Sequence, residues 1–180
     1  MVMYTLINVL VGCLFLVALG YLAFQLFAKW QGDEHIVLQV RHKKVAFKVE
    51  EISFNQVTLY ADVPFQNVGR QNGTVMDVFP RVLLPQEQFD EVHVAAWTTN
   101  ANKERHDGYW EAIIVPTKKG GLIRLRVILT AKHGNIRVDA KNFPDMPIDI
   151  VYQVVGRSDW YLTKGRVILT AQEVEKALLS

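Results

Sequence analysis

The chain has 180 residues and a formal net charge of +2, from 20 lysines and arginines and 18 aspartates and glutamates. This near balance excludes the strongly basic surface of a nucleic-acid-binding protein, so we expect no nucleic-acid partner. The single cysteine, Cys13, excludes a framework of disulfides, and it leaves the rest of the chain without a thiolate for metal binding or nucleophilic attack. We also expect no cofactor.

Residues 1–28 contain no charged side chain and no histidine. At about 1.5 Å of rise per residue, a helix of this length crosses a hydrocarbon core of about 30 Å. Tyr4 at one end, and Lys29 and Trp30 at the other, are residue types typical of the membrane–water interface. The sequence therefore predicts a transmembrane anchor over residues 1–30 that contacts membrane lipid.

Three other interpretations of this segment fit less well. A cleaved signal peptide begins with a cation and turns polar after its cleavage site, whereas apolar residues here continue beyond Gly20 to Phe24. A bacterial lipoprotein has a polar tether after its acylated cysteine, whereas the apolar Leu14 follows Cys13. A buried helix of a soluble protein carries a polar stripe, and this segment has no continuous one.

The sequence leaves open which side of the membrane the rest of the chain faces. Basic residues near the anchor lie only on its C-terminal side, at Lys29, Arg41, Lys43, Lys44 and Lys48. The positive-inside rule therefore favours the cytoplasmic side for a single-pass protein of the cell membrane. Against this, small β-rich domains on uncleaved anchors are often found outside the cytoplasm.

Residues 31–180 are long enough for one domain, and their hydrophobic pattern has the period of β-strands. Apolar residues alternate with their neighbours over 57–65 and 148–154, as in strands with one buried face. Further strands are predicted over 35–40, 44–50, 74–84, 91–98, 109–116, 122–131, 136–140, 160–162 and 166–169, with turns such as Asn72-Gly73 and Lys164-Gly165 between them. This pattern predicts an all-β fold, an antiparallel immunoglobulin-like β-sandwich (or barrel) after an N-terminal transmembrane α-helix.

A short C-terminal helix is predicted over residues 170–179, as part of the 31–180 domain. Thr170 and Glu173 have the spacing of a capping box, and Val174, Ala177 and Leu178 share one face. A helix this short needs to pack against the sheet or a partner.

Residues 63–69 read Val-Pro-Phe-Gln-Asn-Val-Gly and lie between two predicted strands. Their Asn-x-Gly turn is similar to the turn seen in many bacterial immunoglobulin-like modules. The resemblance implies the sandwich architecture, covers a small part of the chain and identifies no family.

No motif in the sequence names a reaction. None of the five histidines has a second ligand at the spacing of a known metal motif, and neither a Gly-x-Ser-x-Gly elbow nor a phosphate-binding glycine loop occurs. A membrane-tethered enzyme or enzyme subunit, with a site of scattered acids and histidines, is one alternative function. A small-ligand or glycan-binding module is another, if aromatic residues share an exposed face: Trp97, Tyr109, Trp110, Trp160 and Tyr161.

Binding is the more natural use of such a fold, since loops held by a rigid scaffold often carry the binding residues. If the chain rises from the membrane through residues 36–40, returns, and rises again through 57–65, the loops 67–73 and 99–108 meet at the far end. They carry the candidate interaction residues Arg70, Gln71, Asn100, Lys103, Arg105 and His106. The sequence thus favours a single-pass, non-catalytic β-sandwich that binds a protein partner or assists the assembly of an envelope complex.

Overall fold

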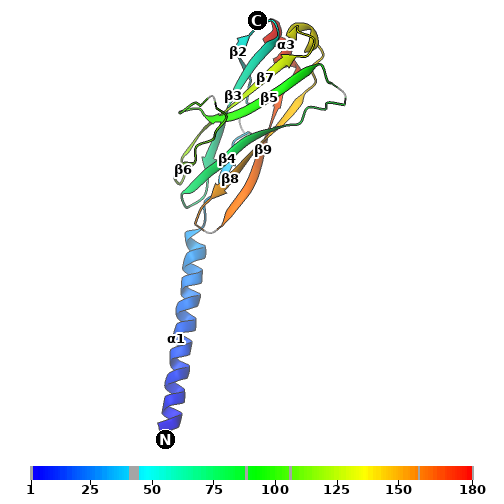
Figure 1. Cartoon of the computed structure of the whole chain (residues 1–180). Coiled ribbons are helices and arrows are strands. Elements are labelled where there is room, and N and C mark those ends of the chain that lie inside the picture. The colour runs from blue at the N-terminus through cyan, green and yellow to red at the C-terminus, as the bar shows by residue number, and fades with distance from the viewer. Residues whose placement is uncertain (1, 41–44, 88, 106, 158, 180) are drawn as a thin grey trace.

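A computed structural model of the chain describes residues 2–40, 45–87, 89–105, 107–157 and 159–179. It begins with the long helix α1, Val2–Gln31, which projects from one end of a body of strands (Figure 1). None of the apolar stretch Met3–Gln31 is buried by the rest of the protein, and by length and composition it could cross a membrane. A helix that is apolar on all sides is normally covered, by protein or by lipid.

The described strands form two antiparallel sheets. The five-stranded sheet contains β1 (Ile36–Leu38), β2 (Lys48–Ile52), β3 (Gln56–Asn67), β5 (Val92–Asn100) and β7 (Gly120–Ala131). The four-stranded sheet contains β4 (Gly73–Val82), β6 (Ile113–Val115), β8 (Met146–Val155) and β9 (Trp160–Leu169).

The strand order within the sheets is that of an immunoglobulin-like sandwich. One sheet has the order β1-β3-β7-β5 and the other the order β6-β4-β8-β9. These orders correspond to the A-B-E-D and C-F-G sheets of the immunoglobulin fold, with β6 added beside β4. The mostly β, antiparallel architecture with a helix at each end of the chain is as predicted, and the strands form a sandwich rather than the alternative barrel.

Strands β1 and β2 lie on the same edge of β3. β1 pairs with the last residues of β3, and β2 pairs with its first residues, both antiparallel. Together they form one interrupted edge strand that runs away from α1, so β3 runs back towards α1. The prediction of a strand running back towards α1 between residues 36–40 and 57–65 is therefore wrong. Residues 57–65 themselves run back towards α1, so the loop 67–73 lies at the end near α1 and not at the far end.

The core lies between the sheets and consists of the alternating apolar residues that the sequence indicates. Leu59 on β3, Leu125 on β7 and Ile150 on β8 are each at most 1% exposed. Their neighbours along each strand point outward, so the outer faces of the sheets carry the polar side chains.

Two further predicted elements take a different form. The sequence predicts a strand over residues 136–140, but they contain the short helix α2 (Ile136–Asp139). The Asn135 side chain caps the start of this helix by accepting a hydrogen bond from the Arg137 N–H. The expected turn at Lys164-Gly165 lies instead within the continuous strand β9, where Gly165 pairs with Ile150.

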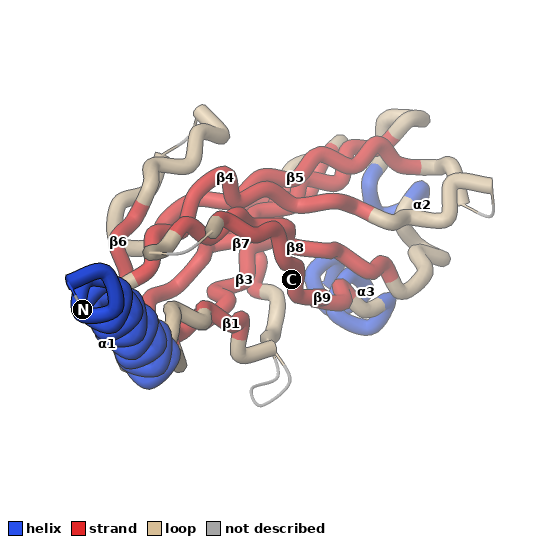
Figure 2. The backbone as a smooth tube through the Cα atoms, turned by 90° about the horizontal axis from the view of Figure 1, so that it is seen from below, coloured by secondary structure: helices blue, strands red, loops and turns tan. Residues whose placement is uncertain are grey.

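The C-terminal helix α3 (Ala171–Leu179) forms as predicted. The Glu173 carboxylate accepts from the Thr170 N–H at 3.0 Å, and the Thr170 hydroxyl accepts from the Glu173 N–H at 3.3 Å. Val174 and Ala177 are buried against the strands. Helices α2 and α3 lie at the opposite end of the sandwich from α1 (Figures 1 and 2).

Candidate functional site

The segment 101–112 joins β5 to β6 and is fixed by short hydrogen bonds at its start. The Lys103 N–H donates to the Asn100 carbonyl at 3.0 Å. The Arg105 N–H donates to the Thr99 hydroxyl at 2.9 Å. Three of the predicted interaction residues therefore lie close together, with Asn100 as the last residue of β5 and Lys103 and Arg105 on the segment that follows it.

These three residues line a shallow cavity of about 360 Å³, to which Tyr109, Glu111 and Ile113 also contribute. Lys103 Nζ forms an ion pair with Glu111 at 2.6 Å. The Arg105 guanidinium lies 5.2 Å from the centroid of the Tyr109 ring, within cation–π range. The cavity is near the lower end of the size of small-molecule sites, and its exposed charges and aromatic ring suit contacts with a protein surface.

Two carboxylates of this loop, Asp107 and Glu111, are held in their charged form. The hydrogen bond from Arg105 lowers the pKa of Asp107 to about 2, helped by the Tyr109 N–H. The hydrogen bond from Lys103 lowers the pKa of Glu111. The pKa of Arg105 is raised in turn by Asp107. The ion pairs Lys103–Glu111 and Arg105–Asp107 are therefore charged on both sides at neutral pH.

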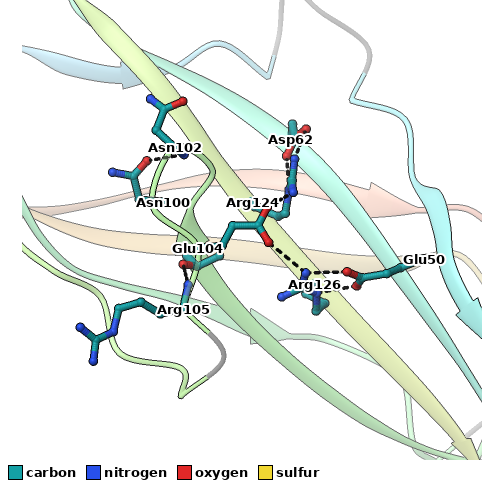
Figure 3. Close-up of polar contacts among 9 residues, drawn as sticks. Glu50, Asp62, Asn100, Asn102, Glu104, Arg105, Arg124 and Arg126 are labelled. Atoms are coloured by element: carbon teal, nitrogen blue, oxygen red, sulfur yellow. Dashed lines mark hydrogen bonds and ion pairs between the residues drawn. The ribbon is translucent and has the colours of Figure 1, made fainter.

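An ion-pair network on the outer face of the five-stranded sheet ties this loop to the strands (Figure 3). Arg126 on β7 binds Glu50 on β2 through two contacts of 2.5 and 2.6 Å. Arg124, also on β7, binds Asp62 on β3 at 2.7 Å. Glu104 of the loop reaches both arginines, at 3.4 Å for Arg126. One carboxylate of the loop thus bridges two arginines of a central strand.

The two arginines also lie over aromatic rings of neighbouring strands. Arg124 is 4.9 Å from the Tyr60 ring centroid, and Arg126 is 5.9 Å from that of Trp97. Arg126 is only 4% exposed, so these partners take the place of water around its guanidinium. Asp62 raises the pKa of Arg124 by hydrogen bonding.

Sequence reasoning missed this network, although a signal for it exists. Arg124 and Arg126 alternate with the buried Ile123, Leu125 and Val127, so both arginines must point to the outer face of the sheet. Their carboxylate partners come from strands and a loop far away in the sequence. Pattern alone does not identify them.

Arg70 and Gln71 do not join the other predicted residues. Arg70 Nη1 donates to the Trp30 carbonyl at 3.0 Å, and Gln71 Nε2 donates to the Gln31 carbonyl at 3.5 Å. Their loop therefore lies against the end of α1, and its predicted position at the far end of the domain is wrong. The sixth residue, His106, lies outside the described residues.

Two features named for the alternative functions, a cluster of metal-type ligands and a shared aromatic face, are not formed by the described residues. Among the described residues, no group of three or more histidine, cysteine, aspartate or glutamate side chains could hold a metal ion. The aromatic residues do not share a face, because Trp97 points outward from the five-stranded sheet and Trp160 lies on the four-stranded one. Trp110 is buried, at 6% exposure.

No protein-family model and no curated protein matches the chain. Solved structures that resemble it include the GAE domain of yeast GGA1, at 8% identity and a TM-score of 0.36 over 75% of this chain and 98% of that chain. Another is the GAE domain of GGA2p from Saccharomyces cerevisiae, at 11% identity and a TM-score of 0.37 over 77% of this chain and 98% of that chain. The strand order described above rests on the pairing within this chain.

Proposed function

We propose that the chain is a single-pass protein of the cell membrane, in which residues 1–30 anchor a non-catalytic β-sandwich formed by residues 31–180. The sandwich binds a protein partner or assists the assembly of an envelope complex. The observation that carries the proposal is that none of the apolar side chains in the span of α1 is buried by the rest of the described protein. Exposing an apolar surface of this length to water is unfavourable, whereas burying it in the hydrocarbon core of a bilayer is favourable.

The contacts between α1 and the sandwich support this arrangement. The side chains of Arg70 and Gln71 bind the last carbonyls of α1, and Arg157 binds the side chain of Gln31. These contacts tie the sandwich to the helix end, so that it stands at a defined height above the membrane. The basic residues that follow α1 favour the cytoplasmic side.

The proposed interaction surface is the loop surface, which we define as Asn100, Lys103, Arg105, Tyr109 and Glu111. Hydrogen bonds from the Lys103 and Arg105 N–H groups hold the start of this segment, and Glu104 joins it to the arginines of β7. A preordered loop loses little conformational entropy on binding, which favours a protein contact. Tyr109 is 60% exposed and offers an aromatic anchor of the kind common in interfaces.

Site-specific photocrosslinking tests this surface in the native membrane. A photoreactive phenylalanine analogue replaces Tyr109 in one variant and Phe54, which is 75% exposed, in the control variant. We expect a defined adduct from position 109 and none of the same mass from position 54. The adduct should disappear when Lys103→Ser and Arg105→Ser are added. An adduct that survives these changes, or that forms equally from position 54, would contradict the assignment of the surface.

A further inference from the structure

Three turns of the sandwich gather around the end of α1. The turn between β3 and β4 binds the helix end through Arg70 and Gln71. The turn between β6 and β7 lies beside it, because the Asn67 N–H donates to the Lys119 carbonyl at 2.8 Å. The turn between β8 and β9 reaches the helix through Arg157, which binds the side chain of Gln31.

Each of these turns carries at least one exposed cation, and α1 adds another in its last turn. We call this set the basic collar, and it consists of Lys29, Arg70, Lys118, Lys119 and Arg157. Within the part of the chain that the structure describes, no ion pair forms at any of the five. The adjoining carboxylates are Asp33, Asp159 and the buried Glu34, so cations outnumber acids here.

The opposite end of the sandwich has no such excess of cations. Exposed acids gather around α2, α3 and the segment between β4 and β5, at Glu87, Asp90, Glu91, Asp145 and Glu175. The exposed cations of that end include Lys132, Arg137, Lys141 and Lys176, so acids and cations nearly balance there. The clear excess of cations thus lies at the helix end of the sandwich.

We propose that the basic collar docks the sandwich onto anionic phospholipid headgroups. This inference rests on the proposed membrane anchoring, because a membrane-spanning α1 places its last turn at the headgroup level. Trp30 and Trp160, which are 72% and 61% exposed, lie at the same end of the sandwich and are the aromatic type that favours this layer. Lysines and arginines close to a membrane surface are attracted by the negative potential of anionic lipids. The collar thereby adds a second contact with the membrane to that of the anchor.

Lipid selectivity of the full-length chain tests the proposal. The protein is reconstituted into vesicles of phosphatidylcholine, and electron paramagnetic resonance measures its association with spin-labelled phosphatidylglycerol and spin-labelled phosphatidylcholine. We expect at least about a twofold preference for phosphatidylglycerol, which high salt abolishes. The variant Lys118→Gln/Lys119→Gln should lose much of this preference, because it removes two cations whose side chains form no ion pair with described residues.

The control variant Lys141→Gln/Lys176→Gln removes the same charge from the opposite end and should keep the preference. Equal association of both lipids with the unaltered chain, or equal loss of selectivity in both variants, would overturn the collar. Near-ultraviolet circular dichroism checks that each variant is folded. A chain that washes out of the vesicles with alkaline carbonate would instead overturn the anchor, so the two failures are distinguishable.

Discussion

Asn67 is the polar residue on which the junction between β1, β3 and β6 depends. It is fully buried, and its side chain makes four hydrogen bonds. Oδ1 accepts from the N–H groups of His35 at 3.2 Å and Gly69 at 3.0 Å. Nδ2 donates to the carbonyls of Gln71 at 2.8 Å and Val115 at 3.0 Å. Asn67→Asp changes one group of the side chain and removes both donors.

The expected loss of unfolding free energy follows from these four hydrogen bonds. A charged carboxylate oxygen would face two carbonyls, so the folded variant must bind a proton, and doing so at neutral pH costs about 4 kcal/mol relative to a usual pKa near 4. The protonated group donates once, so one further hydrogen bond of about 1 kcal/mol is lost. We expect Asn67→Asp to lower the free energy of unfolding by about 3 to 5 kcal/mol at neutral pH.

The pH dependence distinguishes this mechanism from a simple loss of packing. The introduced carboxyl has a higher pKa in the folded chain than in the unfolded chain, so the folded variant binds more protons. The deficit relative to the unaltered chain should therefore shrink as the pH falls, by about 1.4 kcal/mol per pH unit between neutral pH and about pH 4. Urea unfolding of the full-length chain in detergent, monitored by tryptophan fluorescence, measures this deficit at each pH.

Asn72→Asp is the matched control. Asn72 is exposed, and its Oδ1 accepts from the Thr117 N–H at 3.2 Å, a role that a carboxylate keeps. We expect a change within about 0.5 kcal/mol. A loss at Asn67 that is equally small, or that does not vary with pH, would refute the reasoning.

Three further predictions follow from buried contacts. Arg126→Met should lower the free energy of unfolding by about 1 to 2 kcal/mol by removing its ion pairs with the partly exposed Glu50 and with Glu104, and Glu50→Gln should restore part of it in a double-mutant cycle; additive effects would exclude the coupling. Hydrogen bonds from Arg166 and Lys164 hold the pKa of Asp149 well below its usual range, so this stabilisation persists at neutral pH and is lost below about pH 4. Asp149→Asn should therefore lower the Tm at neutral pH, and the gap should narrow on acidification; a constant gap would contradict this. A Cβ at residue 156 would overlap the carboxyl group of Glu34, so Gly156→Ala should cost about 1 to 3 kcal/mol unless Glu34→Ala accompanies it, as thermal unfolding would show.

The sequence predicts the strands of this fold well and their neighbours poorly. Alternation along β3 and β8 shows which side chains are buried, because that property is local to each strand. It does not show that β1 and β2 share one edge of β3, since the pairing depends on contacts between distant segments. Gly165 illustrates the same limit: glycine suggests a turn, but here it gives room for the side chain of Leu38 against a continuous strand.

The candidate site shows a similar division. Lys103 and Arg105 lie on a loop, as their residue types indicate, and Asn100 ends the strand before it. Arg70 has the same character in sequence, yet its guanidinium binds the carbonyl of Trp30 at the end of α1. A polar loop residue can cap a helix or face a partner, and only the fold decides between the two. The basic collar is invisible in sequence for the same reason, because its cations come from separate turns.

The native Cys13 gives the most direct test of a membrane-spanning α1. It lies within the helix, is exposed and is not covered by any other part of the protein, so only lipid can shield it. In sealed vesicles that contain the full-length chain, we expect Cys13 to resist a charged maleimide and to react with an apolar one. The variant Cys13→Ser/Ser53→Cys, with its cysteine on an exposed turn of the sandwich, should react with the charged reagent once detergent opens the vesicles. If Cys13 reacts with the charged reagent in sealed vesicles as fast as that variant does in open ones, α1 does not lie in the bilayer.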